Sequence, residues 1–151
     1  MSEANGQRIK VTVRWVQILD NLEPAFKEKG EFVFKSVVAS DNLGGVRNES
    51  RYPATGHISI SDQPVFNREI INWEIFEGEV TDHLVIDLYG EELDKFSAND
   101  KLDSYHREFR GPLDSWVGTY GPGEDISESD AGDADPEMMS NWWVNIFIDK
   151  V

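Results

Sequence analysis

A group of acidic side chains stands out in the middle of the chain, where residues 84–102 read "LVIDLYGEELDKFSANDKL". Apolar residues alternate along the first part of this segment, as in a β-strand with one buried face. Four acids follow within a short distance: Glu91, Glu92, Asp94 and Asp100. Carboxylates gathered at a strand end form either a cage for a hard cation such as Ca²⁺, which takes about six to eight oxygen ligands, or a solvated turn.

The charge of the whole chain excludes some classes of partner. There are 14 basic and 29 acidic residues, a net charge of -15 and a pI near 4.4. Nucleic-acid binding needs basic residues that replace counterions along the phosphates, so this class is not expected. Direct attraction to an anionic membrane is not expected either, unless a cation intervenes. The simplest role for the excess acid is solubility.

The acidic residues are concentrated near the C-terminus. Between Gly111 and Asp149 there are nine acids and no Lys, Arg or His, and seven of the nine lie in residues 122–137. Like charges repel and nothing there can anchor a core, so residues 121–138 are predicted to form a mobile acidic loop. The alternatives are an additional weak cation site or a tail that binds a partner.

Length and composition predict one domain over residues 1–151. A chain of this size buries roughly 70% of its unfolded surface. It has no cysteine and no apolar segment long enough to cross a bilayer, and its first residues do not resemble a signal peptide. We therefore expect a cytoplasmic protein. With no nucleophile-elbow motif, no phosphate-binding glycine loop and no cysteine, we expect a binding module and not an enzyme.

The apolar pattern has a period of two almost throughout, which predicts β-strands. About eight strands, with no convincing long helix, are typical of an antiparallel β-sandwich. If the strands simply alternate in direction, four connections meet at one end of the sandwich: residues 20–31, 61–67, 90–101 and 121–138. The acidic stretches are therefore predicted to gather at one pole.

Residues 63–102, "QPVFNREIINWEIFEGEVTDHLVIDLYGEELDKFSANDKL", resemble the C2 domain, a β-sandwich known for calcium-dependent phospholipid binding. "QPVFNRE" stands where that family has a sequence like asparagine-proline-valine-tryptophan-asparagine-glutamate. "ELDKFSAND" has the spacing of the family's Asp-x-Asp-x5-Asp loop. "RIKVTVRWVQILD" and "KGEFVFKSVV" are similar, more loosely, to the first strand, first metal loop and second strand. The resemblance implies an eight-stranded, C2-like antiparallel sandwich.

The resemblance also implies a set of calcium ligands. Asp20 and Glu31 would occupy the first two acidic positions, and the remaining ligands would be Glu92, Asp94 and Asp100. Glu31 and Glu92 stand where the family usually has the shorter aspartate, and Asp103 stands near a usual glycine. Many C2 domains have lost calcium binding, so the alternative is a solvated polar rim.

Three functions follow as expectations. The first is calcium-dependent binding of phospholipid or protein through the acidic pole, and the second is a calcium-independent interaction or scaffold domain that holds a basic partner. The third is a carbohydrate-binding jelly roll that uses Trp116 and Trp143, since Trp15, Trp73 and Trp142 fall on the core phase of their strands. The three histidines are expected to be ordinary surface or rim residues: His57, His83 and His106.

Overall fold

A computed structural model describes residues 7–18, 29–40, 47–61, 68–93, 100–121 and 142–151, and all structural statements concern these residues. They form ten strands and one short 3₁₀ helix, η2 (Leu113–Trp116). The strands are β1 (Gln7–Ile18), β2 (Lys29–Ser40), β3 (Arg47–Tyr52), β4 (Ile58–Ser61), β5 (Arg68–Val80), β6 (His83–Glu92), β7 (Asp100–Lys101), β8 (Tyr105–Arg110), β9 (Gly118–Tyr120) and β10 (Trp142–Lys150).

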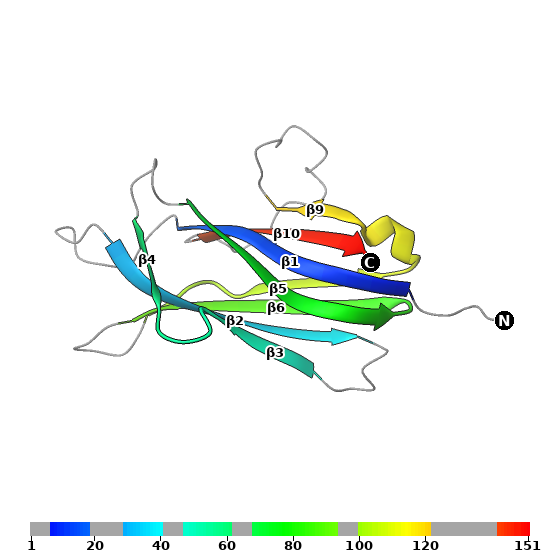
Figure 1. The fold of residues 1–151 in the computed structure, drawn as a ribbon, viewed down its shortest axis with the longest axis horizontal. Helices are drawn as coiled ribbons and strands as arrows, with labels where there is room; N and C mark the ends of the chain where they lie inside the picture. Colours follow the sequence, from blue (N-terminus) through cyan, green and yellow to red (C-terminus); the bar gives the residue numbers. More distant parts are fainter. Residues whose placement is uncertain (1–6, 19–28, 41–46, 62–67, 94–99, 122–141) are drawn as a thin grey trace.

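The strands make two antiparallel sheets that pack into a sandwich (Figure 1). Sheet A has the order β5-β1-β10-β9, and sheet B has the order β3-β2-β6-β7, with β4 beside β2 and β8 beside β6. Because β3 and β4 pair with successive parts of β2, and β7 and β8 with successive parts of β6, the arrangement amounts to eight strand positions. The predicted all-β antiparallel sandwich is confirmed.

Two segments differ from the expected strands. β3 has the sequence "RNESRY", which carries no apolar alternation, and it forms because it completes the edge of sheet B beside β2. The segment "SWVGTY", whose pattern allows a strand, divides between two elements: its first residues belong to η2 and only Gly118–Tyr120 pair with β10.

The core lies between the two sheets and follows the alternation of the sequence. In β6, Leu84, Ile86 and Leu88 are buried, and they face inward together with alternate residues of β2. Phe34 of β2 stacks on Trp142 of β10, with ring centroids 5.4 Å apart, and so joins the sheets. Inward-facing residues of both sheets therefore form one continuous apolar core.

A β-bulge in β1 changes the side on which one tryptophan lies. The register shifts between Val13 and Trp15 against both neighbouring strands, which leaves Arg14 as the extra residue. Beyond it, Trp15 pairs with Asn145 and with Ile70, which is 64% exposed, so Trp15 lies on the outer face of sheet A. Trp15 is 4% exposed, so its expected burial is confirmed, but the bulge reverses the alternation and the residue does not share the inward phase of Val13.

The strand ends that flank the four acidic connections meet at one pole of the sandwich, at the left of Figure 1. There, Ile18 pairs with Trp142, Lys29 with Ser61 and Glu92 with Asp100. The indole of Trp142 donates a hydrogen bond to the carbonyl of Asp103 at 2.6 Å and ties sheet A to sheet B near this pole. The predicted mobile loop at 121–138 falls, except for its first residue, outside the described residues.

Candidate functional site: the acidic pole and a histidine-carboxylate network

Glu92 is the best-defined carboxylate of the acidic pole. It is the last residue of β6 and continues the inward phase of Leu84, Ile86 and Leu88. Its side chain is 0% exposed, and neither carboxylate oxygen has a hydrogen-bond partner in the described part of the chain. Burying a polar group without a hydrogen-bond partner costs stability, and the cost is larger for a charged group.

The backbone around Glu92 leaves room for its side chain. Glu92 pairs with Phe32 of β2, which is also fully buried, and the amide of Leu93 continues this pairing by donating to the carbonyl of Glu31 at 2.8 Å. A Cβ at Gly30 would lie 3.2 Å from Cγ of Glu92 and 2.7 Å from the Phe32 ring. A glycine at position 30 therefore permits the close approach of β2 to the buried carboxylate.

The other predicted calcium ligands are placed only in part. Asp100 lies opposite Glu92 in the β6–β7 register, but its side chain, like Asp20 and Asp94, lies outside the described residues. Glu31 occupies the opposite phase of β2 to Phe32, and its carboxylate lies 3.4 Å from Nε2 of His57, with both side chains about 40% exposed. The register thus brings Glu92 and Asp100 together, whereas the Glu31 carboxylate faces the other side of the sheet. Among described residues no group of three metal-ligating side chains is assembled, and the five-residue ligand set stays a prediction.

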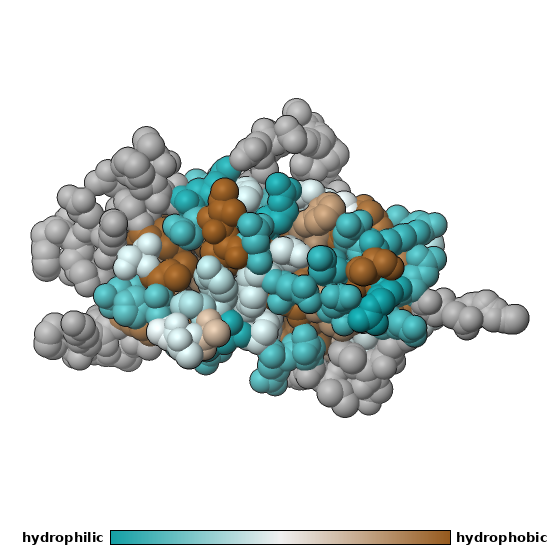
Figure 2. Space-filling view, viewed as in Figure 1, coloured by the Kyte–Doolittle hydropathy of each residue, from teal (hydrophilic) through white to brown (hydrophobic). Residues whose placement is uncertain are grey.

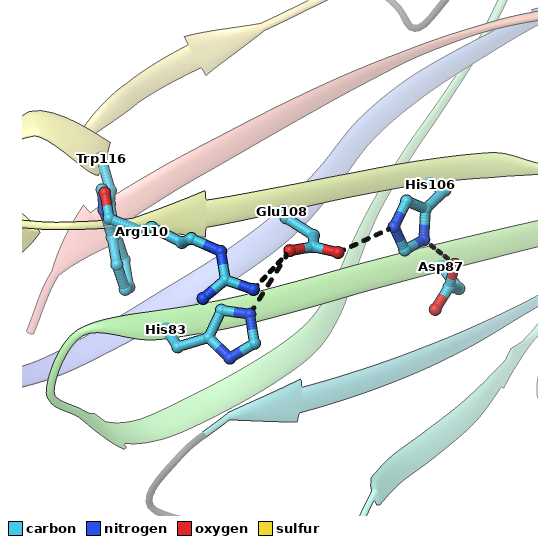
Figure 3. Close-up of polar contacts among 6 residues, drawn as sticks. All are labelled: His83, Asp87, His106, Glu108, Arg110 and Trp116. Carbon is cyan, nitrogen blue, oxygen red and sulfur yellow. Dashed lines mark hydrogen bonds and ion pairs between the residues drawn. The ribbon is translucent and has the colours of Figure 1, made fainter.

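A second polar group lies on the outer face of sheet B, where β6 pairs with β8 (Figure 3). Nδ1 of His106 lies 2.6 Å from Oδ1 of Asp87, the residue directly opposite it, and Nε2 of His106 lies 3.4 Å from Glu108. Glu108 in turn accepts a hydrogen bond of 3.1 Å from Arg110 and lies 3.5 Å from Nε2 of His83. We call these five residues the β6–β8 network.

The network shifts the pKa values of two of its members in opposite directions. The hydrogen bond with Asp87 is the main cause that raises the pKa of His106, against a smaller opposing effect of burial, and Glu108 adds to the rise. The pKa of Glu108 is lowered, first by its hydrogen bond with His106 and then by the contacts of His83 and Arg110. The network therefore favours an imidazolium between two carboxylates.

A shallow groove of about 250 Å³ lies on the outer face of sheet B, lined by residues of β2, β6 and β7 and by the segment after β7. Its lining combines the apolar Val33 and Leu102 with Tyr89 and with the charged Lys35, Glu91 and Lys101. On the face shown in Figure 2, hydrophobic residues form small separate groups among hydrophilic ones over the coloured part of the surface. No large continuous hydrophobic patch is seen on this coloured part of the surface.

The tryptophans expected at the surface differ in position. Trp116 is 1% exposed, donates a hydrogen bond of 3.2 Å to the carbonyl of Arg110 and contacts the ring of Phe109. Its predicted availability for sugar stacking is wrong, because η2 folds this residue into the core. Trp143 is half-buried on the outer face of sheet A. Trp73 and Trp142 are buried, as the alternation predicted.

The β6–β8 network was not anticipated from the sequence. The histidines are 23 positions apart, His83 and His106, and neither belongs to a recognised ligand spacing. Only the antiparallel register, in which Asp87 faces His106 and Val85 faces Glu108, brings the groups together. For Glu92 a signal did exist: it lies in phase with three apolar residues of the same strand, Leu84, Ile86 and Leu88.

The comparisons with known proteins concern the fold. No protein-family model matches the chain, and no curated protein matches its sequence. No helix of the described residues is long and apolar enough to span a membrane. Among solved structures, the chain is similar to a C2 domain of plant Extended Synaptotagmin 1, with 9% sequence identity, 96% of this chain and 95% of that chain covered, and a TM-score of 0.46. A likeness at this identity and TM-score adds no argument, and the antiparallel β-sandwich rests on the strand pairing of the described residues.

Proposed function

We propose that the protein is a non-enzymatic binding module whose acidic pole takes up calcium. The observation that carries the proposal is Glu92, a fully buried carboxylate at the pole with no hydrogen-bond partner among the described residues. A buried carboxylate is stabilised by a cation, and Ca²⁺ prefers carboxylate oxygens. The backbone pairing of Glu92 with Asp100 brings a second acidic residue to the same strand end.

Calcium at this pole changes what the module can bind. The free chain has a net charge of -15 and repels an anionic surface. A bound cation neutralises carboxylates locally and has coordination positions left for an oxygen of a phospholipid headgroup or of an acidic protein. Binding to such partners is therefore expected to require calcium.

The experiment measures the melting temperature of the chain in chelator, in calcium and in magnesium at matched ionic strength. A ligand that binds only the folded state raises its stability, by about 2.7 kcal/mol at 100 times the dissociation constant. We expect a rise that is selective for calcium and is lost in Glu92→Gln and in Asp94→Asn. Glu74→Gln serves as the control, because Glu74 is an exposed acid on the outer face of sheet A opposite Thr12.

Two results would contradict the proposal. One is an equal shift with both ions, which indicates general charge screening, and the other is no shift at all. A calcium-selective rise leads to the next measurement, co-sedimentation with vesicles of phosphatidylcholine and phosphatidylserine in calcium and in chelator.

The second candidate is a calcium-independent interaction domain, which the groove on sheet B favours. Lys35 and Lys101 line it beside Glu91, so this groove fits an acidic segment of a partner better than the basic partner expected from the sequence. Partner binding that persists in chelator, and is weakened by Lys35→Ala and by Lys101→Ala, would support this candidate over the first.

A further inference from the structure

Strand β8 is held to the rest of sheet B from one side. It is six residues long and, within the described segments, pairs only with β6. Its inward residues Tyr105 and Phe109 are buried, whereas His106, Glu108 and Arg110 point outward. Such a short edge strand can open locally at a lower free energy than the central strands.

Two polar contacts link the outward side chains of β8 to β6 in the described structure. One is the contact of His106 with Asp87 at 2.6 Å, and the weaker one brings Glu108 to 3.5 Å from Nε2 of His83, without a hydrogen bond between them. His106 also lies 3.4 Å from Glu108 and so connects the two contacts (Figure 3). The imidazole of His106 is therefore the central group of the polar clamp between the strands.

The protonation state of His106 decides how many of these contacts it can make. A neutral imidazole carries one N–H, so it donates to Asp87 or to Glu108, but not to both. An imidazolium donates from both nitrogens and places a positive charge between the two carboxylates. Because Asp87 and Glu108 are acceptors when ionised, the geometry seen here is complete only with protonated His106.

We propose that the β6–β8 network is a pH-sensitive latch, in which protonated His106 holds the edge strand β8 on β6 and its deprotonation lets β8 open more often. The latch is separate from the acidic pole and needs no cation. In a chain with a large acidic excess, protonation of His106 also places a positive charge between two acids of the network.

The groups that face His106 all favour its charged form. Asp87 faces it from β6 and Glu108 from its own strand, and both raise the pKa of His106. His83 and Arg110 contact Glu108 and lower its pKa. On β2, the residue opposite Asp87 is Val37, which does not titrate.

The direction of the pH effect follows from the raised pKa. A histidine whose pKa is higher in the closed state than in the open state stabilises the closed state at low pH. That contribution is lost as the pH rises through the raised value. Opening of β8 is therefore expected to be greater at about pH 8.5 than at about pH 6.

The experiment combines two NMR measurements on the whole chain in chelator. A titration gives the pKa of His106, and amide hydrogen exchange, corrected for the intrinsic rate at each pH, gives the protection of β8. The expected loss of protection between the two pH values is at most about tenfold for each pKa unit by which the measured value exceeds 6.5. Amides of the central strands β1 and β2 are the internal reference.

Variants separate the latch from other causes. His106→Gln should abolish the pH dependence of β8 protection, and Asp87→Asn should lower the pKa of His106 and reduce the effect. His83→Gln is the matched control, because it removes a histidine from the same network and should leave most of the pH dependence intact. Unchanged β8 protection in the wild type, or a pH dependence that survives in His106→Gln, would overturn the proposal.

Discussion

Replacement of Glu92 by methionine should stabilise the chain when no calcium is present. The wild-type carboxylate is 0% exposed, and both of its oxygens lack a partner in the described structure. A buried polar group left without hydrogen bonds costs about 1–3 kcal/mol. Methionine has a similar length and carries no strongly polar atom, so Glu92→Met should recover an amount of this order.

The expected gain in the free energy of unfolding can be converted into a change in melting temperature. For a domain of about 150 residues, 1 kcal/mol corresponds to roughly 2–4 °C in melting temperature. The melting temperature of Glu92→Met in chelator should therefore exceed that of the wild type by about 2–12 °C. Glu92→Gln keeps a polar amide in the same place and should gain less stability. The expected order of melting temperatures in chelator is therefore methionine, then glutamine, then the wild-type glutamate.

The assay is equilibrium urea unfolding together with calorimetry, in chelator and then in excess calcium. Glu74→Met is the control on an exposed position of sheet A, where a substitution should change the free energy of unfolding by less than about 0.5 kcal/mol. In calcium the wild type should gain stability and Glu92→Met should not. A loss of stability of Glu92→Met in chelator would refute the reasoning, because it would show that the carboxylate makes favourable contacts in the folded state.

Three further predictions concern packing and pH. Gly90→Ala should cost about 1–3 kcal/mol by overpacking, because its Cβ would lie 2.6 Å from Cδ1 of Leu102; an unchanged urea midpoint would contradict this. Arg68→Ala should cost about 0.5–1 kcal/mol, because the guanidinium lies 3.9 Å from the centroid of the Trp15 ring; urea unfolding followed by fluorescence measures the loss, and a neutral result argues against the stacking. His106→Gln should lose more stability relative to the wild type at about pH 6 than at about pH 8.5, since the raised pKa of His106 stabilises the fold only below that value; a gap that is equal at both pH values would contradict the sign.

The alternation of apolar residues was enough to predict most of the fold. In β6 and β10 every second residue is buried, and the two-sheet sandwich follows because such strands each need a partner layer for one face. The same alternation indicates that the side chain of Glu92 points toward the core. Of the strands that escaped prediction, β3 carries no apolar period and forms only beside the edge of β2, and β7 lies in the segment expected to be a connection.

Tertiary structure decided what local sequence could not encode. The bulge at Arg14 turns Trp15 to the outer face of sheet A, because one extra residue reverses a period of two. The candidate latch depends on the register that sets His106 opposite Asp87, and register is a relation between two strands. Sequence by itself therefore determined most of the strands, the buried faces of the regular ones and the acidic composition of the connections. Only the folded chain determined which polar groups meet, because hydrogen bonds and ion pairs act over a few ångströms between residues far apart in sequence.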